Sequence, residues 1–267
     1  MEKDIESFPS KKCPPHLQRI SHYCAFSNCK AIFCSDCLKN HPHNKREELS
    51  EFLCSKFEFI DYLVKGGFGR VFSVKENSEK YAIKVIAIFQ DVDENLSAHT
   101  RQKYLDEVKK EAEFFQTVRH ENIINYYDNF YIENEDRFVI KMELAEYDLK
   151  CYVERNINHS REEIRALFLQ ICNGVCYLHK KGLIHCDLKL SNILIKEGKA
   201  KICDFGGSKK ITENSGKSKT LNLFMGTEDY LAPENFFVEE KKFIKETDIW
   251  ALGIILYKLL ITKLIHF

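Results

Sequence analysis

The chain has 267 residues, enough for one large domain or for one domain with a small module attached. Its apolar share of 44% and charged share of 30% are typical of a folded globular protein, and its formal net charge is zero. Without a basic excess, we expect neither nucleic acid nor an anionic membrane as a partner. The first residues lack the apolar core of a signal peptide, and Lys258 and Lys263 interrupt the apolar run over residues 249–267. We therefore expect a buried helix there, no membrane span, and a location in the cytoplasm or nucleus.

Cysteine and histidine residues gather near the N-terminus. Five of the eleven cysteines lie between Cys13 and Cys37, and the other six are scattered singly. Cys13 with His16, and Cys34 with Cys37, form two short pairs whose spacing lets one backbone turn present two ligands to a tetrahedral ion. The candidate ligands, enough for two closed zinc sites, are Cys13, His16, Cys24, Cys29, Cys34, Cys37, His41 and His43.

This pattern over residues 13–44 resembles a B-box zinc finger. The resemblance implies that the two short pairs hold one zinc ion, that the other four ligands hold the second, and that the module contacts a protein partner. His22 and Asp36 are alternative ligands for the weaker positions. The alternative interpretation is a disulfide knot or a set of unrelated thiols, but without a secretory signal we expect metal. Bound zinc would contribute much of the folding free energy of so small a module.

Residues 45–56 are charged and end in a short apolar run, which predicts a linker with a short helix. The pattern then changes to alternating apolar and polar residues, which predicts strands over residues 57–63, 70–74 and 81–85. The turn over residues 64–69 is rich in glycine. Glycines let a backbone fold closely over phosphate groups, because a Cβ would obstruct that approach.

Further along, residues 104–118 read as a helix, and residues 138–145 read as a buried strand. Apolar residues at helical spacing predict a second helix over residues 161–180. Residues 87–103 are longer and more polar than a connection needs, so we interpret them as an inserted loop. A buried Lys84 would need a carboxylate partner. The first helix offers Glu111, with Glu107 one turn earlier as the alternative.

The sequence HCDLKLSN over residues 185–192 places an acid, a lysine and a carboxamide between short apolar strands. Asp187 is suited to accept a proton, Lys189 to contact a phosphate, and Asn192 to hold a divalent metal. A second acid, Asp204, follows another short apolar strand and begins the turn DFG. Two more motifs follow, the segment GTEDYLAPE over residues 226–234 and the segment that begins at Asp248. The candidate residues thus occur in a fixed order along the chain, namely Lys84, Glu111, Asp187, Asn192, Asp204, Glu234 and Asp248.

Together these motifs resemble the catalytic loop, metal-binding turn and glycine-rich loop of protein kinases of the serine/threonine type, over residues 57–267. The resemblance implies an α+β, two-lobed fold, with a small, mostly β lobe over residues 57–145 and a larger, mostly α lobe over residues 146–267. It also implies ATP and Mg²⁺ as cofactors and a protein as substrate.

The resemblance assigns a role to each motif residue. Asp187 would position the acceptor hydroxyl and take its proton, and Lys189 would balance charge on the moving phosphoryl group. Asn192 and Asp204 would hold magnesium. Thr227 is expected to bond both Asp187 and Lys189, and the aspartate of the last segment is expected to tie down the backbone of the catalytic loop.

The nucleotide site also follows from the resemblance. Lys84, paired with Glu111, would contact the α- and β-phosphates, Met142 would be the gatekeeper, and the backbone of Glu143 and Ala145 would meet the adenine edge; a plain core strand is the alternative there. The expected nucleotide-contacting residues are Leu63, Val64, Lys65, Gly66, Gly67, Phe68, Gly69, Val71, Ala82, Lys84, Met142, Glu143, Ala145 and Leu194. Val64 stands where the family has its first glycine. We expect its β-branched side chain to stiffen the loop or to weaken nucleotide binding without abolishing it.

Cys186 stands where the family usually has an arginine that meets an activation-loop phosphate. An uncharged thiol cannot do this, so we predict an activity that does not depend on a phosphate at Thr220 or Ser218. We interpret Cys186 as a quiet small residue, with a redox-sensitive thiol as the alternative.

Related kinases continue with further helices beyond the position of Phe267. We therefore expect an incomplete larger lobe, a Glu234 that is buried without its arginine partner, and an uncovered apolar face over residues 254–264. Two alternatives to an active kinase follow. One is an inactive scaffold that binds nucleotide, and the other is a protein in which the zinc module has the main role.

Overall fold

The structure, a computed structural model, divides into two compact units. The first unit comprises Met1–Thr117 and Tyr126–Leu144, and the second comprises Val118–Asn125 and Ala145–Phe267. The residues that the structure describes are 22–24, 32–33, 46–48, 50–66, 69–87, 98–155, 159–211, 227–235 and 244–261. A sheet-based unit and a mostly helical unit agree with the predicted α+β class.

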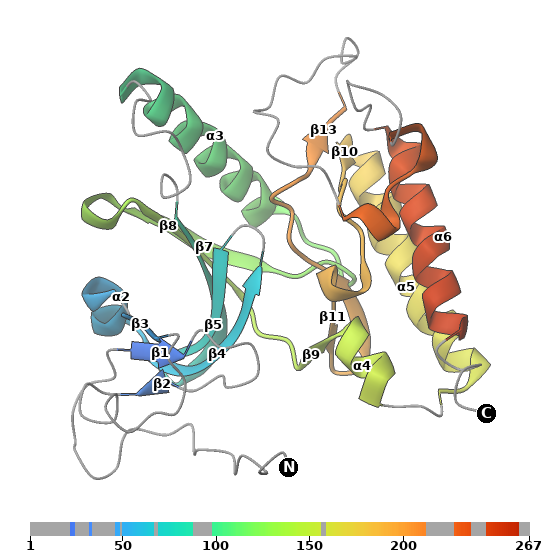
Figure 1. Ribbon diagram of the computed structural model, residues 1–267, viewed down its shortest axis with the longest axis horizontal. Helices are drawn as coiled ribbons and strands as arrows, with labels where there is room; N and C mark the ends of the chain where they lie inside the picture. The colour runs from blue at the N-terminus through green and yellow to red at the C-terminus, as the bar shows by residue number, and fades with distance from the viewer. Residues whose placement is uncertain are drawn as a thin grey trace. The chain divides into compact units, whose positions relative to one another are not determined.

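The first unit is built on an antiparallel five-stranded sheet of order β4-β5-β6-β8-β7 (Figure 1). Its strands are β4 (Glu58–Gly66), β5 (Gly69–Glu76), β6 (Glu79–Ala87), β7 (Tyr126–Ile132) and β8 (Arg137–Glu143). Four of them confirm predicted strands, whereas β7 has no counterpart among the predictions. Gly69, at the start of β5, has φ 149°, and a Cβ there would lie 2.5 Å from the carbonyl oxygen of Val85. Only glycine fits this close approach.

The helix α2 (Glu51–Lys56) confirms the short helix predicted before the sheet. The side chain of Ser50 caps it, accepting the Leu53 N–H at 3.2 Å and donating to Glu135 Oε1 at 2.7 Å in the turn η1 (Glu133–Glu135). Leu53 is buried in the hydrophobic core of the sheet, together with Phe57, Phe59, Tyr62, Phe72, Val74, Ile83, Val85, Ile132 and Val139. The core therefore extends to residues that precede the predicted sheet.

The long helix of the first unit, α3 (Ala98–Thr117), packs against β7, with the rings of Phe115 and Tyr126 5.8 Å apart. It begins six residues before the predicted start, so residues 98–103 belong to a helix rather than to an inserted loop. A second small sheet has the order β2-β1-β3 and consists of β1 (His22–Cys24), β2 (Ile32–Phe33) and β3 (Arg46–Glu48).

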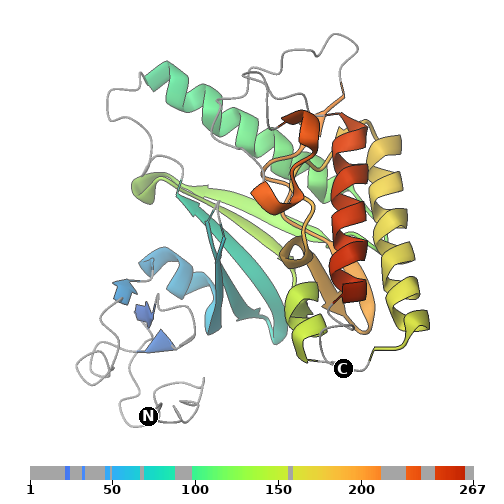
Figure 2. The ribbon, with the colours of Figure 1, turned by 45° about the vertical axis from the view of Figure 1, so that its right-hand side comes forward.

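The second unit contains α4 (Leu149–Arg155), α5 (Arg161–Lys180) and α6 (Lys245–Ile261), and α5 and α6 lie side by side (Figure 2). Its short strands are β9 (Tyr147–Asp148), β10 (Leu183–Ile184), β11 (Ile193–Lys196), β12 (Lys199–Ile202) and β13 (Lys209–Lys210). They form one sheet of order β12-β11-β9 and a separate β10-β13 pair. Single 3₁₀ turns are η2 (Leu190–Asn192), η3 (Glu228–Tyr230) and η4 (Pro233–Asn235).

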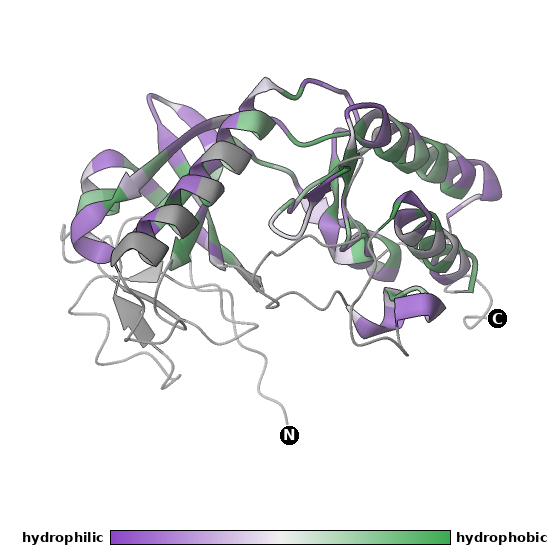
Figure 3. Ribbon diagram, turned by 90° about the horizontal axis from the view of Figure 1, so that it is seen from above, coloured by the Kyte–Doolittle hydropathy of each residue, from purple (hydrophilic) through white to green (hydrophobic). Residues whose placement is uncertain are grey.

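Helix α5 has the predicted bounds because both of its determinants are local. A capping box starts it, in which Ser160 Oγ accepts the Glu163 N–H at 3.1 Å and the Glu163 carboxylate accepts the Ser160 N–H at 2.7 Å. Its buried residues recur at helical spacing, namely Ile164, Leu167, Ile171, Gly174, Val175 and Leu178. Figure 3 shows apolar residues along both α5 and α6.

The prediction of a buried helix at the C-terminal end is only partly right. One side of α6 is buried through Ala251, Ile255 and Leu259, but Trp250 is 44% exposed and Tyr257 is 60% exposed. Within the described part of the chain, no helix is long and apolar enough to span a membrane.

Candidate functional site

Three of the predicted catalytic residues, Asp187, Lys189 and Asn192, lie in the loop between β10 and β11, whereas Asp204 follows β12 (Lys199–Ile202). Asp187 and Asn192 are each 5% exposed. The Asn192 side-chain amide donates to the main-chain oxygen of Asp187 at 2.8 Å and to its Oδ2 at 2.9 Å. Asn192 ends the turn η2, five residues after Asp187, so this amide closes the loop on itself and fixes the direction of the Asp187 carboxylate.

Two further side chains contact the same carboxylate. Lys189 Nζ lies 2.8 Å from Asp187 Oδ2 and 2.8 Å from Thr227 Oγ1. The Thr227 hydroxyl in turn donates to Asp187 Oδ1 at 2.9 Å. The predicted contacts of Thr227 with Asp187 and Lys189 are therefore present. Each oxygen of the Asp187 carboxylate has a donor, and a lysine ammonium stands beside it.

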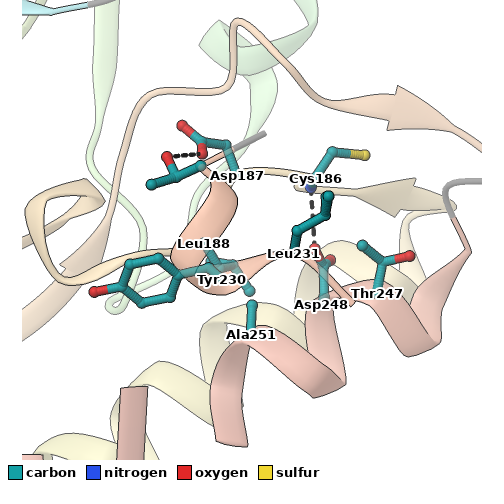
Figure 4. A pocket seen from close by; sticks show the side chains of 9 residues that line it. Cys186, Asp187, Leu188, Tyr230, Leu231, Thr247, Asp248 and Ala251 are labelled. Carbon is teal, nitrogen blue, oxygen red and sulfur yellow. Dashed lines mark hydrogen bonds between the residues drawn. The ribbon is translucent and has the colours of Figure 1, made fainter. Parts of the chain in front are cut away.

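Asp248 on α6 accepts hydrogen bonds from the backbone of the same loop. Its Oδ2 accepts the His185 N–H at 2.9 Å. Its Oδ1 accepts the Cys186 N–H at 3.0 Å, as Figure 4 shows. These bonds are those expected of the aspartate that ties down the catalytic-loop backbone. Cys186 has φ 66°, in the left-handed region that non-glycine residues rarely adopt. The anchor therefore supports a strained residue directly before Asp187.

His185 was not singled out from the sequence, yet its fully buried ring connects the two predicted acidic motifs. Its Nδ1 accepts the Asp187 N–H at 3.3 Å, and its Nε2 lies 3.0 Å from the carbonyl oxygen of Cys203. Since Nε2 faces a carbonyl oxygen, this nitrogen carries the ring proton. Cys203 immediately precedes Asp204, which has φ 62°. In the sequence, the one signal for this connecting role of His185 is its position between two short apolar strands.

The Cys186 thiol is buried, and its Sγ donates to the carbonyl oxygen of Ile184 at 3.6 Å. Burial raises the pKa of this thiol above the ordinary value, and the charge of Asp248 raises it further. The nearby charge of Lys209 acts in the opposite direction and is outweighed. A thiol that stays protonated is a poor nucleophile, which favours the interpretation of Cys186 as a quiet residue.

The donor set fits a hard divalent cation. Because Nδ2 of Asn192 is turned to Asp187, the Oδ1 of its carboxamide is left for another partner. Carboxamide and carboxylate oxygens, here of Asn192 and Asp204, are the ligand types that Mg²⁺ prefers, and Mg²⁺ usually takes only one or two protein carboxylates.

The first unit contains most of the predicted nucleotide-contacting residues. Lys84 on β6 is buried, as expected, and the register pairs Ala82 with Met142 on β8. Glu143 is also buried. Glu111 lies on α3, but its side chain, like that of Glu107, is outside the described part of the structure, so its pairing with Lys84 stays a prediction.

The remaining predicted residues are placed by element. Leu63 and the backbone of Val64, Lys65 and Gly66 lie on β4, Gly69 and Val71 lie on β5, Ala145 follows β8, Leu194 lies on β11, and Gly67 and Phe68 lie outside the described residues.

The predicted zinc ligands lie outside the described residues, apart from the backbone of Cys24 in β1. Among the residues that are described, no group of three or more His, Cys, Asp or Glu side chains is placed to hold a metal. The zinc sites therefore stay a prediction.

The expectation of a buried, unpaired Glu234 is wrong, because this residue is exposed on η4. It lines a cavity of about 510 Å³ together with Glu246, Ile249, Trp250, Gly253 and Ile254. The carboxylate is therefore solvated, and the desolvation cost expected for it does not arise.

Comparison with known proteins places these motifs in a family. Residues 57–267 match the protein kinase domain. The chain is 32% identical over 222 residues to an Aurora kinase of Schizosaccharomyces pombe, covering 82% of this chain and 58% of that protein. It is 35% identical over 227 residues to NUAK family SNF1-like kinase 1 of Homo sapiens, covering 82% and 32%. It is also 31% identical over 204 residues to serine/threonine-protein kinase TIO of Arabidopsis thaliana, covering 76% and 14%. The chain thus spans less than two thirds of the length of these relatives.

Proposed function

Because the chain belongs to the protein kinase family, we propose that it transfers the γ-phosphate of ATP to serine or threonine hydroxyls of a protein substrate inside the cell. One observation carries the proposal: the buried carboxylate of Asp187 is contacted at once by Asn192, Lys189 and Thr227. Such a constellation orients a proton acceptor and sets a cation beside it.

Phosphoryl transfer requires little covalent help from a protein, since alignment and charge neutralisation provide most of the catalysis. In this proposal Asp187 aligns the acceptor hydroxyl and receives its proton. Lys189, held between Asp187 and Thr227, balances negative charge on the transferred group. Magnesium, when held by Asn192 and Asp204, supplies further charge neutralisation at the phosphates.

The proposed nucleotide site draws on the first unit. Lys84 would contact the α- and β-phosphates, with Glu111 as its partner, and the backbone near Met142 would meet the adenine. The burial of Lys84 supports this role, since a buried ammonium requires an anionic partner.

The second part of the proposal concerns residues 13–44, which we infer to be a zinc-binding module for a protein partner. The two short ligand pairs support it. The backbone of β1, β2 and β3 forms a small antiparallel sheet in this region and in the following linker.

The central test is Asp187→Asn in the full chain, assayed with radiolabelled Mg-ATP and mixed protein substrates. Loss of the proton acceptor should lower the transfer rate by about 10²–10⁴-fold, while a nucleotide-induced rise in melting temperature remains. The matched control is Asp128→Asn, an exposed aspartate on β7, which should retain the wild-type rate. A wild-type protein that shows the melting shift without any transfer would establish the alternative, an inactive nucleotide-binding scaffold.

A further inference from the structure

The helix α2 (Glu51–Lys56) precedes the residues that match the protein kinase domain, yet it contributes to the core of the first unit. Its Leu53 is 1% exposed and packs among residues of the five-stranded sheet. Resting on the function proposed above, we propose that α2 is a detachable brace of the nucleotide-binding sheet. The hydrogen bond from Ser50 to Glu135 is the latch of this brace, and release of α2 lowers the affinity of the protein for ATP.

The brace packs on the face of the sheet that lies behind the proposed nucleotide site. Successive side chains of a strand point to opposite faces. On β6, Ala82 and Lys84 therefore occupy one face of the sheet. Ile83 and Val85 occupy the other face, where Leu53 packs with them in one hydrophobic cluster. The strand that carries Lys84 is thus supported by α2 from its opposite side.

The latch is the hydroxyl of Ser50, a residue that is 6% exposed. This hydroxyl accepts the Leu53 N–H at 3.2 Å, which caps α2, and donates to Glu135 Oε1 at 2.7 Å. Glu135 lies in the turn η1 between β7 and β8, 85 residues further along the chain. Because the acceptor is a carboxylate, this hydrogen bond is stronger than one between neutral groups. It ties the start of α2 to the hairpin that leads to Met142.

The brace is detachable because α2 is short and has few buried anchors. A helix of six residues is unstable by itself in water, since so short a segment does not recover the cost of nucleation. Its contacts with the sheet therefore hold it in place. Within the described side chains of residues 50–56, Ser50 and Leu53 are buried, whereas Phe52 and Ser55 are exposed. Weakening either buried anchor should therefore release the whole segment.

Cys54 reports whether α2 is docked, because this residue is partly buried and packs against the same hydrophobic cluster. Ser50→Asp retains a side-chain cap, but its carboxylate repels that of Glu135. In the full chain, Ser50→Asp should speed iodoacetamide labelling of Cys54 by about tenfold or more, as read by peptide mass spectrometry. Ser55→Asp is the matched control, because it adds the same charge on the exposed side of α2 and should label at the wild-type rate.

The double variant Ser50→Asp/Glu135→Gln separates the latch from a general loss of stability. Its amide at position 135 donates to the carboxylate at position 50, so labelling of Cys54 should return to near the wild-type rate. Cys176 is exposed on α5 and should label equally in every variant, which controls for the reagent. Equal labelling of Cys54 in wild type and Ser50→Asp, or a double variant that labels as fast as Ser50→Asp, would overturn the latch.

The link to ATP is tested by reciprocity. Because release of α2 weakens ATP binding in this proposal, bound ATP must hold α2 in place by the same factor. Saturating Mg-ATP should therefore slow labelling of Cys54 by about fivefold or more, both in wild type and in Ser50→Asp. Cys54 packs on the face of the sheet opposite to Lys84, so ATP bound at Lys84 does not shield it directly.

Two outcomes distinguish the brace from the proposed function. Labelling of Cys54 at one rate with and without ATP, in a protein whose melting temperature ATP raises, would overturn the coupling between α2 and the nucleotide site. A wild-type protein whose melting temperature ATP does not raise would refute the proposed nucleotide site. In that case the labelling rates without nucleotide would still decide whether Ser50 and Glu135 latch α2.

Discussion

At the scale of single residues, Cys186 combines a demanding backbone with an unreactive side chain. Its φ of 66° is held by Asp248, and its thiol faces the protein interior. No charge is available at this position to meet a phosphate. Independence from a phosphate at Thr220 or Ser218 stays a prediction, because both residues lie outside the described ones.

The raised pKa of the Cys186 thiol gives a prediction about its chemistry. The thiolate is the nucleophile, and a raised pKa means that it forms only at a higher pH than for an ordinary cysteine. In the native protein we expect iodoacetamide at pH 7–8.5 to leave Cys186 unlabelled and to label the exposed Cys176, as read by peptide mass spectrometry. Equal labelling of the two cysteines in native protein would refute this, and unfolded protein should label at both.

At the scale of the elements, α5 shows how one helix can be specified locally and still depend on distant contacts. Its capping box and apolar spacing define its bounds. Its packing depends on Gly174, where a Cβ would lie 2.7 Å from Ile202 Cδ1 and 2.9 Å from the carbonyl oxygen of Asn122. The glycine is therefore required by the approach of other segments rather than by the helix itself.

Two glycine-to-alanine substitutions test this directly. In a helix interior alanine is favoured over glycine by about 1 kcal/mol. Gly253 on α6 has open space around it, so Gly253→Ala should stabilise by up to about 1 kcal/mol. At Gly174 the close contacts should outweigh this gain, and overpacking should destabilise by about 1–3 kcal/mol. Urea-unfolding midpoints of the two variants should move in opposite directions; a shift of Gly174→Ala toward higher urea would contradict the packing argument.

At the scale of the whole molecule, we expect the residues near the N-terminus and the kinase-related residues to have different sources of stability. The sheet of the first unit has a hydrophobic core, which includes Leu53 of α2. The proposed zinc module is too short for a comparable core, so metal should supply its stability. The two parts should therefore respond differently to a chelator.

We expect about two zinc ions per chain by metal analysis, because structural zinc sites are four-coordinate and the N-terminal region offers ligands for two such sites. Replacing Cys34 and Cys37 together by serine should remove at least one ion, whereas Cys176→Ser should retain the wild-type content. A strong chelator should unfold the N-terminal module and leave the melting temperature of the five-stranded sheet unchanged. A zinc content well under two in the wild-type protein would refute the two-site prediction.

What the sequence could predict is what its short-range patterns contain. The bounds of α5 follow from a capping box and a helical repeat within one segment. The candidate catalytic residues Asp187, Lys189 and Asn192 belong to one motif, and Thr227 was expected to bond Asp187 and Lys189. Strands of the sheet were predicted from the alternation of apolar and polar residues. The start of α3 was not, because the helix begins at Ala98, earlier than the predicted start at residue 104.

The sequence by itself thus determined the family, four strands of the five-stranded sheet and the bounds of α5, because each rests on neighbours along the chain. Only the tertiary structure decided the supports of the catalytic loop. His179 and His185 meet Asp248 across separations of 69 and 63 residues, and Leu53 becomes part of a core built mostly by later strands. It also decided that Glu234 is exposed rather than buried. Burial and hydrogen bonding between distant segments depend on how those segments pack, and local spacing carries no record of that packing.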